Sequence, residues 1–239
     1  MTRLLDLGID HIRNIIMDMA KLSEDSVVTA IKSYQEGTHV KKQIFDWSEK
    51  LRILQDEVAD LAIELIARYQ PVATDLRFIK SCMEIAYGFS RFGRYAYDIV
   101  DVLETMGSIS ADCDKSDVLE MARTVREMIF LSVHALQSRD KNSAQKLYEM
   151  DDTVDTLYRK YLREVITSLP PPPPSSSATT SSPSPDHQPQ QQQKTLAENP
   201  RCYVSALLIL RYLERISDHA CYIGDSVHYI VTGVSSPRR

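Results

Sequence analysis

The amino-acid sequence predicts an all-α protein made of two tandem three-helix bundles. Three observations support this prediction. Apolar residues recur at helical spacing along most of the chain, only 7 glycines occur among 239 residues, and a stretch near residue 90 is repeated near residue 214. Leu, Ile, Ala, Glu, Lys and Arg, which favour helices, dominate outside one segment. No stretch shows the strict apolar–polar alternation expected of a half-buried strand.

The first part of the chain contains four predicted helical segments. Residues 3–20 carry apolar side chains at helical spacing, and a second segment begins at the capping sequence Ser23-Glu-Asp-Ser and runs to about residue 34. A long helix is then predicted over 40–69, where Gln70-Pro71 ends it. The next helix covers 73–106 and ends at Gly107.

The second part begins after a polar break at 108–116 and holds three predicted helices, over 118–137, 143–169 and about 199–233. Proline at a first-turn position opens the last helix, and Gly233 closes it. Residues 170–195 consist mainly of Pro, Ser, Thr and Gln, with almost nothing to bury. We interpret them as a disordered low-complexity insert at the surface.

The last helix has two predicted faces. Its apolar stripe consists of Ile209, Leu213, Ile216, Ala220, Ile223, Val227 and Ile230. Three carboxylates, Glu214, Asp218 and Asp225, fall on the opposite side. This helix therefore combines a packing face with an acidic face, which either binds a ligand or faces water.

Residues 87–101 align without gaps on residues 211–225, at an offset of 124. A repeat of this length indicates two related three-helix units. The first unit is predicted over residues 1–107, with an N-terminal extension. The second covers 116–169 and 196–233, with residues 170–195 inserted into it. Where the second copy has Glu214 and Asp218, the first has Ser90 and Arg94.

Two acidic pairs in the second unit suggest a metal site. Asp151 and Asp155 lie one helical turn apart, and Glu214 and Asp218 have the same spacing on the last helix. If the two helices are antiparallel neighbours, four to six oxygen atoms converge. Such a set suits hard cations such as Mg, Mn, Ca or Fe, and Zn if a histidine joins. Weaker candidate ligands are Asp152, His219 and Asp225. The alternative is a solvated acidic surface.

The net charge, the cysteine pattern and the length of the apolar runs limit the classes of function and the cellular location that we expect. The net charge of −5 gives no electrostatic support for binding nucleic acid. The four cysteines (Cys82, Cys113, Cys202 and Cys221) form no CxxC pair, so we expect reduced thiols. No signal peptide is evident, and the longest apolar run is far shorter than the roughly 20 residues that cross a bilayer. We therefore expect a cytoplasmic protein.

Three spaced motifs resemble those of one family, the phosphate-uptake regulators called PhoU. They are Gln70-Pro-Val-Ala-Thr-Asp-Leu-Arg77, the paired acidic motif Asp151-Asp-Thr-Val-Asp155, and Leu213-Glu-Arg-Ile-Ser-Asp218-His-Ala. The resemblance implies a six-helix cytoplasmic protein, often dimeric, that binds metal at its acidic motifs. It also implies a negative regulator that couples a phosphate transporter to a sensor kinase, or otherwise restrains transport, without catalysis.

The sequence departs from the family pattern in the first unit. The positions that match the four carboxylates carry Ser48, Arg52, Ser90 and Arg94, so we expect the first metal site to be lost or altered. The second unit keeps Asp151, Asp155, Glu214 and Asp218, and the metal there could be Fe, Zn, Mg or Mn. Two other functions stay open: a carboxylate-bridged metalloenzyme on a helical bundle, and a metal-free helical adaptor.

Overall fold

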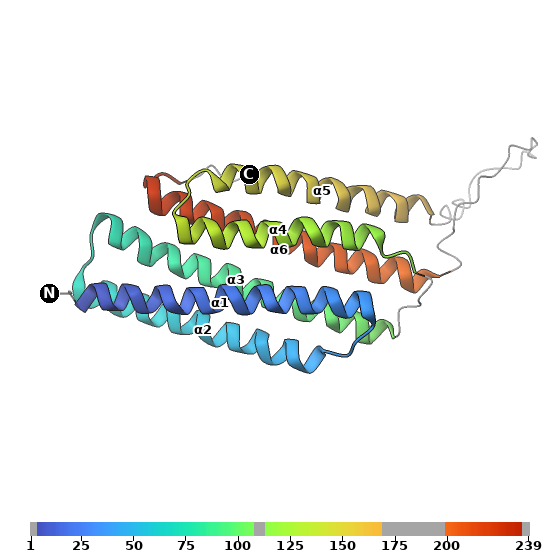
Figure 1. Cartoon of the computed structure of the whole chain (residues 1–239), viewed down its shortest axis with the longest axis horizontal. Coiled ribbons are helices and arrows are strands. Elements are labelled where there is room, and N and C mark those ends of the chain that lie inside the picture. The colour runs from blue at the N-terminus through green and yellow to red at the C-terminus, as the bar shows by residue number, and fades with distance from the viewer. Residues whose placement is uncertain (1–3, 108–112, 169–198, 236–239) are drawn as a thin grey trace, which may run out of the picture.

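The computed structural model describes residues 4–107, 113–168 and 199–235, and within them it contains six helices and no strand. The helices are α1 (Leu4–Glu36), α2 (Lys41–Tyr69), α3 (Ala73–Met106), α4 (Ser116–Ser138), α5 (Ser143–Ser168) and α6 (Pro200–Thr232). All six run along the long axis, with α1 and α2 in the lower part of Figure 1, α5 at the top, and α3 and α6 crossing between them. The all-α prediction is confirmed. The predicted insert at 170–195 lies outside the described residues.

One predicted boundary is wrong: the segments 3–20 and 23–34 form a single helix, α1. The sequence Ser23-Glu-Asp-Ser does not start a new helix. Instead, the Ser23 hydroxyl donates to the backbone oxygen of Ala20 at 2.9 Å, and the Ser26 hydroxyl donates to that of Leu22 at 2.7 Å. Serine can bond to the preceding turn of its own helix in this way, so the residue type alone does not identify a cap.

The two groups of three helices meet mainly through α3 and α6, which run antiparallel side by side. Gly88 shows how closely they approach, because a Cβ atom at this position would lie 2.9 Å from Cγ1 of Ile223. A side chain there would force the helices apart or displace Ile223. α6 also packs on α4 and α5, so it is covered along most of its length.

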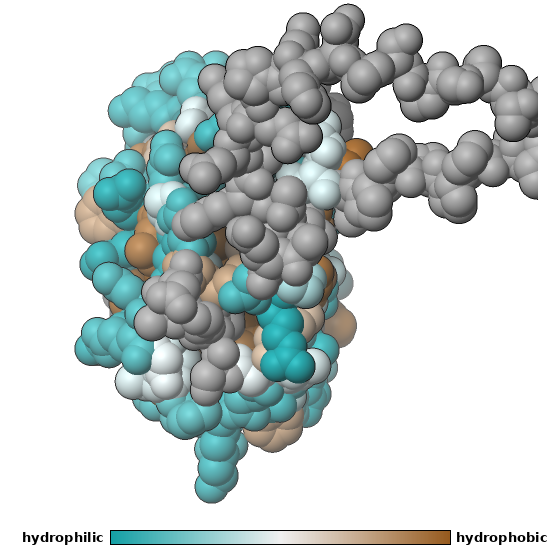
Figure 2. All heavy atoms as spheres, turned by 90° about the vertical axis from the view of Figure 1, so that its right-hand side faces the viewer, coloured by the Kyte–Doolittle hydropathy of each residue, from teal (hydrophilic) through white to brown (hydrophobic). Residues whose placement is uncertain are grey.

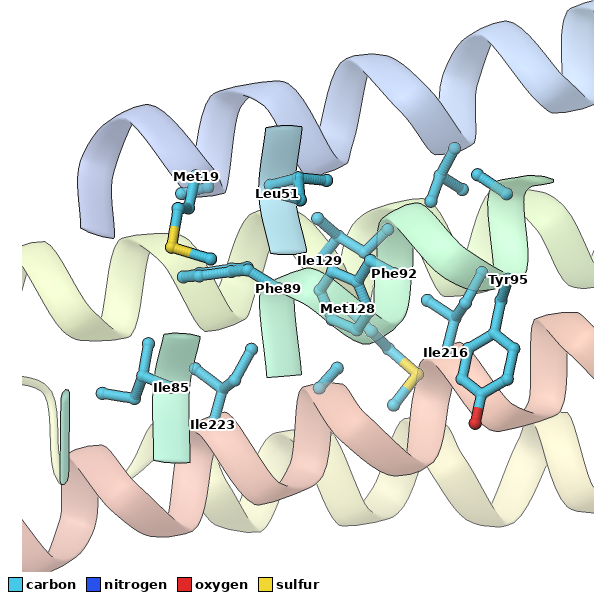
Figure 3. Close-up of a cluster of buried hydrophobic side chains, with 14 of the residues drawn as sticks. Met19, Leu51, Ile85, Phe89, Phe92, Tyr95, Met128, Ile129, Ile216 and Ile223 are labelled. Carbon is cyan, nitrogen blue, oxygen red and sulfur yellow. The ribbon is translucent and has the colours of Figure 1, made fainter. Parts of the chain in front are cut away.

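Large apolar side chains fill the space between the two groups of helices. Phe89 and Phe92 of α3 are fully buried and contact each other edge to face, with ring centroids 5.9 Å apart. Figure 3 shows them between Met19 of α1 and Ile216 and Ile223 of α6. The predicted apolar stripe of α6 is buried throughout: Ile209, Leu213, Ile216, Ala220, Ile223, Val227 and Ile230. The coloured surface at the end of the bundle in Figure 2 is, by contrast, mostly hydrophilic.

The Gln70–Arg77 motif forms the connection from α2 into α3, next to the end of α6. Gln70 adopts a left-handed conformation (φ 46°) as the C-cap of α2. The Arg77 guanidinium lies against Gly233, the C-cap of α6, where an added Cβ would be 3.4 Å from Nη1. A cation at this place interacts favourably with the C-terminal end of the helix dipole. None of the described helices is both long and apolar enough to cross a membrane.

The expectation of four reduced thiols is wrong. A disulfide joins Cys113, just before α4, to Cys202 in the first turn of α6, with the two Cα atoms 5.6 Å apart. The partners are 89 residues apart in sequence, and only the packing of α4 and α6 brings them together. Cys82 and Cys221 are buried free thiols, and burial raises the pKa of Cys82 to about 12.

Reduction of the Cys113–Cys202 disulfide should lower the free energy of unfolding by about 2–4 kcal/mol, because the bond restricts a long loop in the unfolded chain. Chemical denaturation with and without a thiol reductant measures the difference. The Cys113→Ser/Cys202→Ser variant should match the reduced protein and should no longer respond to reductant. Equal stability of the oxidised and reduced wild type would contradict the prediction.

Candidate functional site

The four carboxylates predicted to bind metal lie on α5 and α6, which pack side by side and antiparallel. Asp151 and Asp155 come from α5, and Glu214 and Asp218 come from α6. The hydroxyl of Ser217 fixes the alignment of the two helices, because it donates to Oδ1 of Asp151 at 2.8 Å. We call these four side chains the acidic cluster.

The carboxylates of the acidic cluster lie close enough to repel one another. Burial raises the pKa of Glu214 from 4.5 to about 7, and the nearby charge of Asp218 adds to this shift. Burial also raises the pKa of Asp218, with a further contribution from Asp155. The pKa of Asp151 is raised by burial as well, although the hydrogen bond from Ser217 opposes the shift. A bound cation would relieve this repulsion.

Arginines already pair with the cluster. Arg211 Nη1 lies 2.7 Å from Oε1 of Glu214, and Arg215 Nη1 lies 3.2 Å from Oδ2 of Asp218. Asp155 bonds to Arg159 on its own helix. Among the described residues, no group of three or more His, Cys, Asp and Glu side chains is arranged to hold a metal ion.

The chemistry of the donor atoms suits a hard cation, although their arrangement in the described residues does not form a coordination site. All are carboxylate oxygens, and Oε2 of Glu214 is buried with no hydrogen-bond partner, although Arg215 Nε forms an ion pair with it at 3.6 Å. An orphaned buried oxygen is unfavourable unless a ligand or water satisfies it. The cluster thus brings carboxylate oxygens of two helices close together.

The three weaker candidates have different surroundings. His219 packs among aromatic rings, with centroids 5.4 Å from Tyr222, 5.6 Å from Tyr87 and 5.9 Å from Tyr95. Burial, helped by the charge of Arg91, lowers its pKa to about 4, so the ring is neutral at pH 7. Oδ2 of Asp225 accepts a hydrogen bond from the Tyr148 hydroxyl at 2.7 Å. Asp152 is exposed beside Asp151.

The corresponding place in the first unit has a different chemistry. A Cβ at Gly93, which aligns with Ser217, would lie 3.5 Å from Cα of Ser48, so α2 and α3 approach each other as α5 and α6 do. Arg52 bonds to Glu49 and Asp56 of its own helix, and Arg94 pairs with Asp98 at 3.2 Å. Serines and arginines thus stand where the second unit has its carboxylates.

Several partners of the candidate ligands were not singled out as functional in the sequence: Arg159, Arg211, Arg215 and Tyr148. Each arginine lies three or four residues from the carboxylate it pairs with, a spacing that places both on one helix face. This spacing in the sequence could have identified the three arginines as partners of the carboxylates. The hydrogen bond from Tyr148 to Asp225 joins different helices and has no such signal.

The raised pKa of Glu214 predicts a pH dependence of stability. An acid whose pKa is higher in the folded state binds its proton more tightly there, so its contribution is most favourable below the unfolded pKa of about 4.5. That contribution is lost as the pH rises through about 7. Glu214→Gln should therefore raise the melting temperature of metal-free protein more at pH 8 than at pH 5. Thermal unfolding at both pH values checks this; a larger gain at pH 5 would contradict it.

Comparison with known proteins identifies the family. The family model described as "PhoU domain" matches residues 16–103, 118–182 and 187–227. The phosphate-specific transport system accessory protein PhoU homolog of Clostridium acetobutylicum is 23% identical over 236 residues, covering 98% of this chain and 97% of its own. The corresponding homolog 1 of Methanothermobacter thermautotrophicus is 27% identical over 229 residues, covering 93% of each chain.

Solved structures share the fold. The crystal structure of PhoU from Pseudomonas aeruginosa aligns with a TM-score of 0.71 at 22% identity, covering 96% of this chain and 99% of that one. The crystal structure of the phosphate transport system regulatory protein PhoU from Streptococcus pneumoniae gives 0.74 at 16% identity, covering 98% and 100%. Because the family model matches well over half of the residues, the chain belongs to the PhoU family.

Proposed function

We propose that this protein is a negative regulator of phosphate uptake that works as an adaptor and not as an enzyme. Its family membership supports this proposal, as do the names of relatives aligned over almost the whole chain, which are phosphate-specific transport system accessory proteins. The partner would be a component of the phosphate transporter, a sensor kinase, or both. The protein would act from the cytoplasm, as a homodimer that associates peripherally with the membrane transporter.

The regulatory site would be a metal centre at the acidic cluster. The observation that carries this assignment is the burial of Glu214 beside Asp218, where the two side chains repel each other and Oε2 of Glu214 has no hydrogen-bond partner. Asp151, Asp155, Glu214 and Asp218 would hold Fe, Zn, Mg or Mn, with Asp152, His219 and Asp225 as possible additional ligands. The bound ion would offset the carboxylate charges and hold α5 against α6.

A metal-free adaptor is the second candidate, and the arginine pairs favour it. Arg211, Arg215 and Arg159 each neutralise part of the cluster without any ion. In this case the acidic surface of α5 and α6 would itself contact a basic surface of the partner. The two candidates share a fold and a partner class, and they differ in whether the carboxylates bind metal.

Phosphate uptake in cells that lack the protein tests the regulatory role. Loss of a negative regulator should raise uptake of labelled phosphate in phosphate-rich medium, and the wild-type gene on a plasmid should restore the lower rate. Complementation with Glu214→Ala/Asp218→Ala then shows whether the acidic cluster is needed for regulation. Unchanged uptake in the deletion strain would rule out the proposed negative regulation.

A further inference from the structure

A cavity of about 640 Å³ lies between α3, α5 and α6, beside the acidic cluster. Its volume is typical of sites that bind small molecules. Asp151 and Asp218 lie at its border with the acidic cluster, whereas Glu214 and Asp155 do not line it. The cavity continues along α6 as far as Tyr229, so most of it lies outside the proposed metal centre.

The charges that line the cavity favour a positively charged ligand. Its four carboxylates are Glu84, Asp151, Asp218 and Asp225, and its basic side chain among the lining residues is Lys80. Glu84 of α3 and Asp225 of α6 both line the cavity, and Glu84 is held to α6 because the Ser226 hydroxyl donates to its Oε2 at 3.2 Å. Carboxylates gathered in a partly enclosed space are stabilised by a cation.

Aromatic rings form much of the remaining lining, and one of them already contacts an ammonium group. The Lys80 ammonium lies 5.2 Å from the centroid of the Tyr229 ring and 2.8 Å from Oε1 of Glu84. This contact combines a ring face with a carboxylate, as organic-cation sites do. Tyr87, Tyr148 and Tyr222 supply three further rings. The Lys80 contact thus shows a ring face and a carboxylate of the cavity on either side of one ammonium group.

Two polar atoms at the cavity lack a partner. His219, which lines the cavity, is only 9% exposed, and its Nδ1 has no hydrogen-bond partner. Oδ1 of Asp225 is also buried without a partner, although its other oxygen accepts the Tyr148 hydroxyl. Buried polar atoms of this kind are usually satisfied by a ligand or an ordered water. An ammonium group supplies several N–H donors at one position.

We propose that this cavity binds a small aliphatic amine of the polyamine class. One ammonium group would lie at Asp225, beside Glu84, and the alkyl chain would lie against the tyrosine rings. The carboxylates along α6 suit a ligand with more than one charge, because Asp218 and Asp225 are separated by roughly 10 Å of helix. The cavity shares Asp151 and Asp218 with the acidic cluster, whereas Glu84 and Asp225 lie outside the cluster.

Titration calorimetry of the full chain with spermidine, at physiological salt to screen non-specific attraction, tests the proposal. We expect one binding site, and Asp225→Asn should weaken it by about tenfold because a charged hydrogen bond is lost. Glu49→Gln removes an exposed carboxylate of α2 and is the matched control, with no expected change.

Two exposed positions test the aromatic wall without disturbing the core. Tyr222→Leu should weaken spermidine binding by about twofold to fivefold, whereas Tyr222→Phe keeps the ring and should bind as wild type. Lys80→Ala removes the internal ammonium and should tighten binding by a similar factor. Weaker spermidine binding in Lys80→Ala would mean that the Lys80 ammonium does not compete with the ligand for this place, and it would overturn the proposal.

Three further outcomes would also overturn it. One is no binding at millimolar spermidine. Another is an equal effect of Asp225→Asn and Glu49→Gln. The third is binding of an arginine-containing peptide that depends on Asp225 while spermidine fails to bind, which would assign the cavity to a partner's side chain.

Discussion

Phe89→Ala should lower the free energy of unfolding by about 3–5 kcal/mol. Phe89 is fully buried between the two groups of helices, and its ring packs edge to face on Phe92 (Figure 3). Removing the ring leaves a cavity that α3 and α6 cannot close by moving together, because the adjacent Gly88 already lies against Ile223 with no room for a Cβ atom. Chemical denaturation followed by circular dichroism measures the loss.

Phe130→Ala is the matched control, since it makes the same chemical change on α4 at a side chain that is 63% exposed. Its effect should stay within about 0.5 kcal/mol. Similar losses in both variants would mean that Phe89 does not lie in the core that joins the two groups of helices. A normal folded spectrum for Phe89→Ala at low denaturant would show that only stability, and not the fold, has changed.

The helix pattern was predictable because strong local signals mark most helix ends. Pro71 follows the end of α2, Gly107 and Gly233 cap α3 and α6 with positive φ, and Pro200 opens α6. These residues act through backbone geometry that the sequence specifies directly. Ser23 was misread because a serine hydroxyl bonds equally well to a following amide as a cap or to a preceding carbonyl within a helix.

Long-range features were harder to predict. The disulfide depends on Cys113 and Cys202 meeting across 89 residues, a separation at which the sequence gives no geometric constraint. The apolar and acidic faces of α6 were predicted correctly, but the burial of Glu214 on the acidic face was not predicted. Glu214 is buried because α6 packs on α3, α4 and α5 together. Helical periodicity places a residue on a face and does not say how many neighbours cover that face.

The candidate site was predictable as a set of positions but not as a set of contacts. The i,i+4 spacing of Asp151 and Asp155, and of Glu214 and Asp218, specified which carboxylates share a helix face. Their partners depend on side-chain conformation: Asp151 bonds to Ser217, whereas Glu214 turns to Arg211. Whether an ion replaces these arginines depends on the free energy of the metal-bound carboxylates relative to that of the arginine-paired ones. The spacing of residues in the sequence does not determine this difference.

Glu214→Ala/Asp218→Ala should abolish metal uptake by the purified protein. The variant removes both α6 carboxylates and leaves only the α5 pair, of which Asp151 is bonded to Ser217 and Asp155 to Arg159. Two carboxylates on one helix provide too few oxygens for a hard cation. Elemental analysis of protein purified without chelator or affinity metal gives the stoichiometry. Helix content should stay nearly unchanged, because both side chains lie outside the apolar stripe of α6.

The control Glu49→Ala/Asp56→Ala removes two carboxylates from α2 that both pair with Arg52, so it changes the net charge equally. We expect it to retain the wild-type metal content, which would tie binding to the acidic cluster and not to overall charge. If the Glu214/Asp218 variant retained the metal as well, the site would be wrongly assigned. If neither wild type nor control contained metal, Arg211 and Arg215 would be the cluster's permanent counterions. The acidic surface would then act by contacting a basic partner, because no exchangeable ion would remain to regulate it.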